Sequence, residues 1–478
     1  MSRLLVVVAS VVLSACSLSG NESAPPRSQF YFPAGIAHVD VPGKTEGALF
    51  VANANFDKRY GTGSIDVVDL DAVGLPPLGS ATGVQALADL HVEASQTVQI
   101  ASFAGELGLL PLPNGRYRVY VPTRSEGMRV YQAEAAFDAQ GVPTLKCIGG
   151  EGQNCTSLGA SLSPNAFQRS STGVPRAPSP YGVVATVRAC AATADCCPAE
   201  GDCSRSCNAG QCVDANGDPF ADVWFTHLSQ ADSPTQSGTN FRAYLVRLDS
   251  DTFAVDEGSF INIGAGGTNS IVARGPWVYA SGRVVSPAPN LVRLVRRDGV
   301  TLASSLESFF RVADARGLTF SSDGKKIYLV GRIPDTLLVI KLDETNVDAP
   351  VLSFVRGVPL PDAPNQVAVI ARPGRGDLVA VTATTGGSLA LYDEDVGDLV
   401  ALIPGLGVQP FGLAVDHRGT AARLYVSLFG DGRVAVVDIA DLSRPQEARL
   451  VAHLGRSQLC LTRGATSPAC RALDGGVQ

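Results

Sequence analysis

Eleven cysteines are the residues whose chemistry is easiest to read from their spacing. Ten of them lie beyond the N-terminal region, and an even number of clustered thiols favours disulfide bonds. Cys147 and Cys155 form one close pair, and Cys460 and Cys470 form another. The other six crowd one segment: Cys190, Cys196, Cys197, Cys203, Cys207 and Cys212. This segment lacks the Cys-x-x-Cys and His spacing of a zinc site, so we expect a disulfide-held loop, which requires an oxidising compartment.

Metal, cofactor and catalytic signatures are otherwise sparse. Asp214-Ala215-Asn216-Gly217-Asp218 offers oxygen ligands at alternate positions, as calcium loops do, but its glycine is fourth rather than sixth. Residues 57–63 make a weaker case for the same ion, and a plain turn is the favoured interpretation of both. The sequence shows no nucleophile elbow, P-loop, haem attachment site or dinucleotide fingerprint. We therefore predict no cofactor, with calcium as the weak alternative.

The N-terminus has the pattern of an export signal. Arg3 precedes an apolar run from Leu4 to Leu13, which is too short for a permanent membrane helix. Small residues then lead to Cys16, and Leu13-Ser14-Ala15-Cys16 resembles a bacterial lipobox. The resemblance implies that residues 1–15 are removed and that Cys16 carries lipid. An ordinary signal peptide with an incidental cysteine is the alternative.

Composition and charge limit the function classes. Residues 16–29 contain little that could be buried, so they are expected to be a flexible tether. The whole chain is 45% hydrophobic and 17% charged, which favours a large globular core. Its net charge of -7 comes without a Lys/Arg-rich block, which argues against a nucleic-acid partner. We expect a monomeric body anchored in the bacterial envelope by lipid, in the outer membrane because Ser17 rather than an aspartate follows Cys16.

The body, residues 30–455, is built from a repeat. A hydrophobic triplet, often begun by an aromatic residue, occurs seven times, and each copy is followed by a polar turn and an alternating strand. The copies are Phe50-Val51-Ala52, Tyr120-Val121-Pro122, Trp224-Phe225-Thr226, Tyr279-Ala280-Ser281, Tyr328-Leu329-Val330, Val379-Ala380-Val381 and Tyr425-Val426-Ser427. Period-two alternation between turns is typical of β-hairpins, and four such strands per unit predict propeller blades.

Pro410 to Asp438 shows the repeat most clearly, with Pro-x-Gly-x-Ala, Leu-Tyr-Val and Val-x-Val-x-Asp segments. This pattern resembles the YVTN-type propellers, whose repeat is also found in propeller lactonases. The resemblance implies an all-β, seven-bladed propeller of four-stranded antiparallel blades. A six- or eight-bladed propeller, or another seven-unit β-fold, is the alternative. Insertions are expected at about residues 72–95, 133–177 and 189–213, and residues 456–478 form a C-terminal tail with the Cys460 and Cys470 pair.

Propeller ligands commonly bind where the inner strands begin, at the end of the central channel. The first residues of the inner strands are predicted to be Tyr181, Asn269, Arg316, Asn365 and Phe411. The following hairpins add Asn53, Arg124, His227, Arg283 and Arg332. We expect Arg316 to matter most, because Gly317 permits close approach and a guanidinium offers a fork of donors to an anion. The alternative is that Arg316 is held in a salt bridge with a carboxylate of a neighbouring blade.

Two classes of function remain open. The favoured one is a non-enzymatic, lipid-anchored propeller that serves as a rigid scaffold for an envelope protein or a polysaccharide. The alternative is a lactonase-like hydrolase that uses polar channel residues, a hypothesis that rests on fold kinship.

Overall fold

The computed structural model describes residues 23–80, 88–125, 128–150, 152–162, 179–197, 205–228, 244–255, 261–262, 268–282, 292–297, 301–302 and 312–457. Cys16 with its lipobox, Arg283, Cys203, Cys460 and Cys470 lie outside these residues. Within the described residues, no helix has the length and apolar character needed to cross a bilayer.

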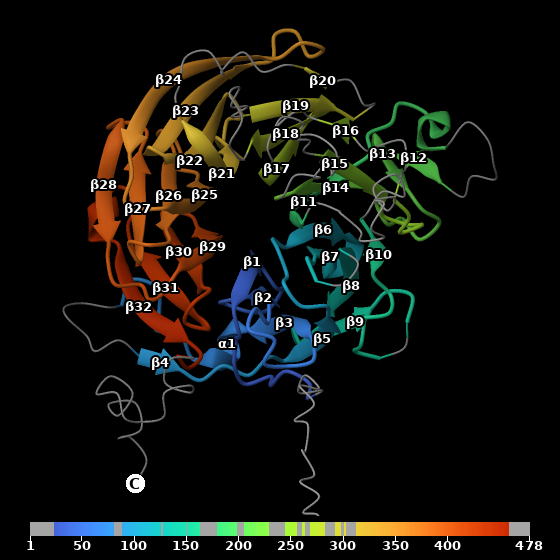
Figure 1. Ribbon diagram of the computed structural model, residues 1–478, viewed down its shortest axis with the longest axis horizontal. Coiled ribbons are helices and arrows are strands. Elements are labelled where there is room, and N and C mark those ends of the chain that lie inside the picture. The colour runs from blue at the N-terminus through green and yellow to red at the C-terminus, as the bar shows by residue number, and fades with distance from the viewer. Residues whose placement is uncertain are drawn as a thin grey trace, which may run out of the picture.

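Seven antiparallel sheets follow one another around a ring, which confirms the seven-bladed β-propeller (Figure 1). Blade 1 contains β1 (Pro33–Val39), β2 (Ala48–Asn53), β3 (Gly63–Asp69) and β5 (Gln96–Ile100). Blade 2 contains β6 (Gly108–Leu112), β7 (Arg116–Pro122), β8 (Arg129–Phe137) and β9 (Pro143–Cys147), with β10 (Ala160–Ser161) also paired to β8. Blade 3 contains β11 (Pro180–Val187), β14 (Ala221–His227), β15 (Tyr244–Asp249) and β16 (Ile261–Asn262).

The remaining blades use consecutive strands. Blade 4 contains β17 (Thr268–Arg274), β18 (Trp277–Gly282), β19 (Val292–Arg296) and β20 (Thr301–Leu302). Blade 5 contains β21 (Ala313–Phe320), β22 (Lys326–Ile333), β23 (Asp335–Asp343) and β24 (Val351–Pro359). Blade 6 contains β25 (Pro364–Ile370), β26 (Leu378–Ala383), β27 (Ser388–Asp393) and β28 (Asp398–Ile403). Blade 7 contains β29 (Pro410–Arg418), β30 (Ala421–Leu428), β31 (Arg433–Ile439) and β32 (Arg449–Leu454).

The repeated triplet lies on the second strand of each blade and packs the blades together. Its aromatic side chain is buried in the apolar cluster shared with the next blade: Phe50, Tyr120, Trp224, Tyr279, Tyr328 and Tyr425. In blade 6 the strand register places Ala380-Val381-Thr382 at these positions, one residue later than the sequence pattern suggested. The repeat is therefore the sequence signal of the interface between blades.

The expected insertions are partly redrawn. Residues 133–147, assigned to the second insertion, instead complete β8 and form β9, because their alternating side chains pair with β7 and β8. In the first insertion, Leu70–Val73 forms the short helix α1, and Ala88–Leu90 forms the strand β4. The third insertion contains the 3-10 turn η3 (Thr193–Cys196) and a small hairpin of β12 (Ser206–Asn208) and β13 (Gln211–Val213).

Disulfide bonding of the clustered cysteines is confirmed. The bonds join Cys147 to Cys155, Cys190 to Cys207, and Cys196 to Cys212, and Cys197 is also disulfide-bonded. Buried Phe220 packs against Cys196 and Cys212. The guanidinium of Arg205 lies 3.6 Å from the centre of the Phe220 ring, so the cysteine-rich loop (residues 189–213) is docked onto blade 3.

The ring is not closed by a strand of blade 1 that replaces one of the four strands of blade 7. Instead β4, from the connection between β3 and β5 of blade 1, pairs in parallel with β32 of blade 7. Side chains reinforce this contact, since Arg433 donates to Asp89 at 2.9 Å. Arg423 of blade 7 donates to Glu46 of blade 1 at 2.6 Å. The first insertion and these ion pairs therefore reinforce the apolar contacts between blades 1 and 7 that close the ring.

Candidate functional site at the channel mouth

A shared bulge shapes one end of the channel, here called the mouth. In six blades the register of the first strand is interrupted near its start, directly after one residue: Pro33, Pro180, Thr268, Ala315, Pro364 and Pro410. The residues inside this bulge include Tyr181, Asn269, Arg316, Asn365 and Phe411, the five predicted from the sequence. A bulge leaves its residues unpaired with the neighbouring strand, which frees them for contacts across the ring.

Hydroxyl groups bind the bulges of neighbouring blades together. Thr226 accepts from the Gly182 amide at 2.7 Å and donates to the Asn269 carbonyl of the next blade at 2.6 Å. Ser427 makes the same two contacts, with the Gly412 amide and with the Ala34 carbonyl of blade 1. Glycine is required at position 412 because a Cβ there would lie 2.4 Å from the Ala34 carbonyl oxygen. The mouth is thus a preorganised ring of backbone.

Tyr181 is the centre of the predicted polar group. Its ring lies 6.2 Å from that of Phe411, edge to face, and the Arg124 guanidinium lies 6.0 Å from its centre. Burial raises the pKa of the Tyr181 phenol far above its usual value, and nearby Glu106 raises it further. Arg124, Arg316 and Arg332 oppose that shift, so all three cations lie within electrostatic reach of the phenol. Tyr181 is therefore a protonated hydrogen-bonding group at neutral pH.

The arginines of the mouth differ in how they are held. Arg332 donates to the Pro364 carbonyl at 2.8 Å and to the Asn365 amide oxygen at 3.1 Å. Arg316 is paired with Asp314 at 2.6 Å, a carboxylate of its own strand and not of a neighbouring blade as the alternative had it. Burial lowers the pKa of Arg124, whose buried Nε has no partner among the described residues. Arg124 is the better candidate for contact with an added anion.

The other predicted residues are buried within the blades or lie outside the residues that the structure describes. His227 is buried, and its backbone amide donates to Thr268 at 2.9 Å. Asn269 is also buried. Asn53 is a buried link within blade 1, donating to Asp66 at 2.6 Å. Arg283 lies outside the described residues.

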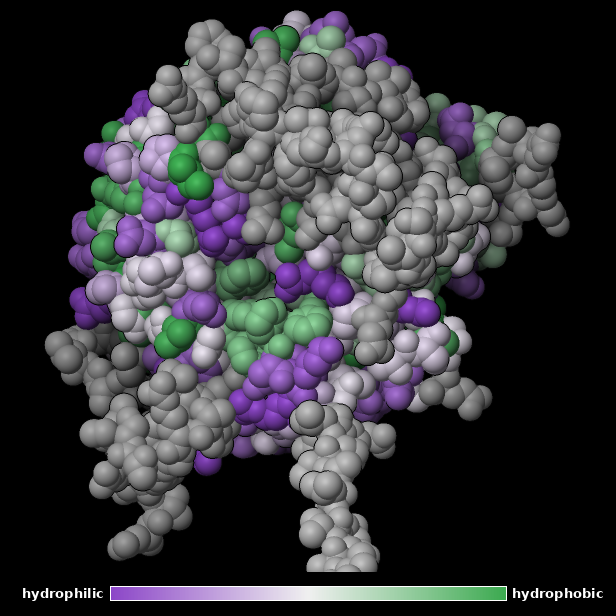
Figure 2. Space-filling model, in the orientation of Figure 1, coloured by the Kyte–Doolittle hydropathy of each residue, from purple (hydrophilic) through white to green (hydrophobic). Residues whose placement is uncertain are grey.

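A group of phenylalanines beside the mouth was not anticipated. Phe32, Phe56, Phe103, Phe411 and Phe429 form one connected set of ring contacts with centroid distances of 5.2–6.0 Å. We call this set the phenylalanine cluster. Phe56 is 49% exposed, and Figure 2 shows an apolar patch near the centre of this face, bordered by hydrophilic residues. The members come from blades 1, 2 and 7, which are adjacent only because the ring closes.

Glu106 was also missed, and it closes the channel below the mouth. Its carboxylate accepts a hydrogen bond from Gln366, which lies across the ring in blade 6. It also bonds to Ser270 and to the backbone amide of Val183. Burial raises the pKa of Glu106 to about 7. A signal existed in the sequence, because Ala104-Gly105-Glu106 aligns with Ala315-Arg316-Gly317 and puts a carboxylate where four other blades have glycine.

The cavity around Glu106 is small. It measures about 190 Å³ and is lined by residues of all seven inner strands or the segments that lead into them, including Tyr181, Gln366 and Phe411. Pockets that enclose a small-molecule substrate usually measure about 300–1,000 Å³. The space beside Glu106 is therefore smaller than a usual substrate pocket.

The candidate calcium loops have the geometry of turns. Asp214 accepts from the backbone amides of Asn216 and Asp218, at 2.8 and 2.9 Å, and Asp218 is paired with Arg116. Asp57 is paired with Arg59 at 2.8 Å. Elsewhere, His38, Asp40 and Asp416 bring possible ligand atoms together, but His38 Nε2 already lies 2.8 Å from the Glu46 carbonyl. Asp416 in turn accepts from Arg418, so these groups are engaged within the protein.

Comparison with known proteins does not assign this chain to a family. No protein-family model matches the chain, and no curated protein matches it. The chain is similar to a solved structure of Kuenenia stuttgartiensis hydrazine synthase, with 12% identity over 88% of this chain and 99% of that one, and a TM-score of 0.48. It is equally similar to the periplasmic gluconolactonase PpgL of Pseudomonas aeruginosa, with 12% identity over 89% and 96% of the two chains and a TM-score of 0.48. The likeness is one of fold.

A third similar structure is a putative 6-phosphogluconolactonase from Bacteroides uniformis. Its identity is 12% over 69% of this chain and 79% of that one, with a TM-score of 0.39. At such low identity, propellers with different activities share only their architecture. The function of this propeller therefore has to be argued from the mouth itself.

Proposed function

We propose that this protein is a lipid-anchored envelope propeller whose channel mouth binds an acidic partner, either a polysaccharide or a protein segment. The observation that carries the proposal is the juxtaposition of the phenylalanine cluster with Arg124 and Tyr181 at one end of the channel. Exposed aromatic rings bind apolar faces, and a guanidinium binds carboxylates or phosphates. Because the mouth is a rigid backbone ring closed from below by Glu106 and Gln366, it presents these groups as a fixed shallow surface.

The lactonase-like alternative depends on Glu106. Its pKa of about 7 would suit a general base near neutral pH. Against this, the Glu106 carboxylate is already bonded to Gln366, Ser270 and Val183, and the cavity beside it, at about 190 Å³, is below the usual range for small-molecule sites. Binding is therefore favoured over hydrolysis.

The binding proposal predicts that Phe56→Ser weakens binding by about tenfold or more, because loss of an aromatic anchor commonly costs about 1–2 kcal/mol. Arg124→Gln is expected to weaken binding of acidic probes only. The measurement is calorimetric titration with a uronic-acid oligosaccharide, an acidic peptide that contains aromatic residues, and a neutral dextran oligosaccharide. Whichever acidic probe binds identifies the class of partner.

Val396→Ser is the matched control, because Val396 is 62% exposed in a turn of blade 6, away from the mouth. It should bind as the unchanged protein does. Failure of both acidic probes to bind, or equal losses in Phe56→Ser and Val396→Ser, would remove the proposal. Turnover of a lactone that disappears in Glu106→Gln would instead establish the hydrolase.

Anchoring is proposed from Cys16 alone and has its own test. Cys16→Ser is expected to move the protein from the membrane fraction to the soluble fraction, because no acyl chain can then be attached at that sulfur. Fractionation and intact mass of the unchanged and variant proteins measure this. Equal membrane retention of both, with no acyl mass on the unchanged protein, would exclude the lipoprotein assignment.

A further inference from the structure

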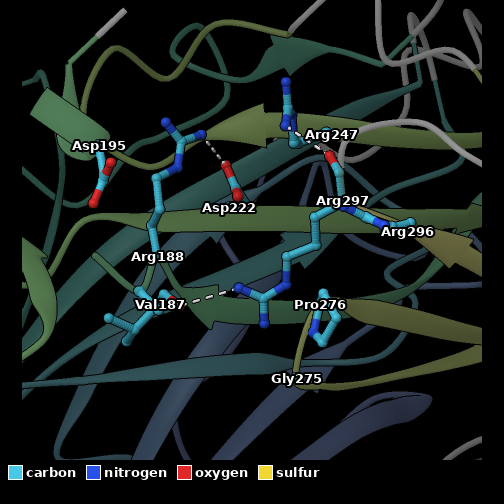
Figure 3. Close-up of a pocket in the computed structure, with 10 residues that line it drawn as sticks. Val187, Arg188, Asp195, Asp222, Arg247, Gly275, Pro276, Arg296 and Arg297 are labelled. Carbon is cyan, nitrogen blue, oxygen red and sulfur yellow. Dashed lines mark hydrogen bonds and ion pairs between the residues drawn. The ribbon is translucent and has the colours of Figure 1, made fainter. Parts of the chain in front are cut away.

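A second pocket lies on the opposite face of the propeller from the mouth. It measures about 880 Å³ and is formed where blades 3 and 4 meet the cysteine-rich loop (Figure 3). The strands β11 and β17 begin at the mouth, and the pocket is lined by residues near their far ends, such as Val187 and Gly275. This pocket is therefore separate from the channel mouth.

Arginine dominates the charge of this pocket. Its charged lining residues are Arg188, Arg247, Arg296, Arg297, Asp195 and Asp222. The lining holds four cations and two carboxylates, and Asp348 outside the lining pairs with Arg296 at 2.9 Å, so one positive charge remains in excess in a chain whose net charge is -7. We call it the arginine pocket.

Both carboxylates are committed to neighbours within the protein. Asp222 accepts from Arg188 at 2.6 Å, and its side chain is only 4% exposed. Asp195 accepts from the backbone amides of Ala191 and Ala192, at 2.7 and 2.8 Å. In Figure 3, Asp222 lies between Arg188 and Arg297. The carboxylates thus position the pocket wall and do not balance all of its arginines.

Arg297 is the least compensated of these cations. It donates to the Val187 carbonyl at 3.2 Å, while its buried Nε has no partner among the described residues. Its own carbonyl accepts from Arg247 at 3.1 Å, which brings a second guanidinium to the same place. Burial lowers the pKa of Arg297, while Asp222 raises it and Arg188 lowers it by a smaller amount. An anion at this site would offset the cost of burying the Arg297 guanidinium and could accept from its remaining donor.

We propose that the arginine pocket binds a multiply charged oxoanion, such as a phosphoryl group or a pair of carboxylates, carried on a small polar molecule. Planar guanidinium groups match the geometry of such oxygens and bind them in pairs. The volume is within the usual range for small-molecule sites, and Val187 and Pro276 provide an apolar wall. The disulfide-held loop then has a role, because η3 with Asp195 forms one side of the site.

The test is calorimetric titration of the full-length protein with pyrophosphate, citrate and glucose, each at low and high ionic strength. We expect pyrophosphate or citrate to bind, glucose not to bind, and salt to weaken the interaction. Stronger binding of pyrophosphate would identify a phosphoryl ligand, and stronger binding of citrate a carboxylate ligand. If neither anion binds, the proposal is wrong.

Arg297→Gln should weaken anion binding by about tenfold or more, as expected when a charge-assisted hydrogen bond is lost. Arg444→Gln is the control, since it removes the same charge from an exposed surface position on blade 7. Arg247→Gln provides an independent variant if Arg297→Gln lowers the melting temperature. Equal effects of the pocket and control variants would show that binding depends only on net charge and would overturn the site.

Discussion

Replacing Arg423 with methionine is expected to lower the free energy of unfolding by about 3–5 kcal/mol, the usual cost of leaving buried charges without their partner. Arg423 is fully buried and donates to both oxygens of Asp438, at 2.7 and 2.9 Å. It also donates to Glu46 at 2.6 Å and to the Pro76 carbonyl at 2.7 Å. The substitution therefore strands the buried carboxylate of Asp438 and leaves Glu46 with Arg418 alone, which weakens the junction of blades 1 and 7.

Urea denaturation measures this loss, and hydrogen exchange locates it, with β4 and β32 expected to exchange faster. Arg444→Met is the matched control, because Arg444 pairs with Asp441 and Glu447 on the exposed surface. Exposed pairs of this kind contribute about 0–1 kcal/mol. A loss in Arg423→Met no larger than in the control would mean that the ion pairs do not hold the ring closed.

Glu106→Gln is expected to stabilise the protein above pH 7 and to have little effect near pH 4.5. In the unfolded chain Glu106 ionises near its usual pKa of 4.5, whereas burial raises its pKa to about 7 in the folded protein. Between these values the folded state binds more protons, so the contribution of Glu106 to stability falls as the pH rises to 7. At about 1.4 kcal/mol per unit of pKa, the full change is on the order of 3 kcal/mol.

The measurement is the difference in unfolding free energy between the unchanged protein and Glu106→Gln at several pH values. Taking the difference cancels Asp66, whose pKa burial also raises to about 7. A difference that grows from pH 4.5 to pH 7 and then levels off supports the assignment. A constant difference across that range would mean that Glu106 ionises normally in the folded channel.

The sequence predicted the parts of the site that depend on local pattern. The triplets identified seven blades because period-two alternation and the turns around it act between residues close in the chain. The same pattern located Tyr181, Arg316 and Phe411, because six of the blades interrupt their inner strand with the same bulge. The strand pairing in the structure corrected details that the pattern could not give, such as the one-residue shift of the triplet in blade 6.

The contacts that give the site its chemistry were decided by the tertiary structure. Glu106 meets Gln366 across 260 residues of chain, and the phenylalanine cluster forms only once blades 1 and 7 become neighbours. The arginine pocket needs blade 3, blade 4 and the cysteine-rich loop together. Alternation in the sequence specifies that a strand buries one face. Which charged groups lie opposite a given side chain across the ring depends on how the seven blades are arranged when the ring closes.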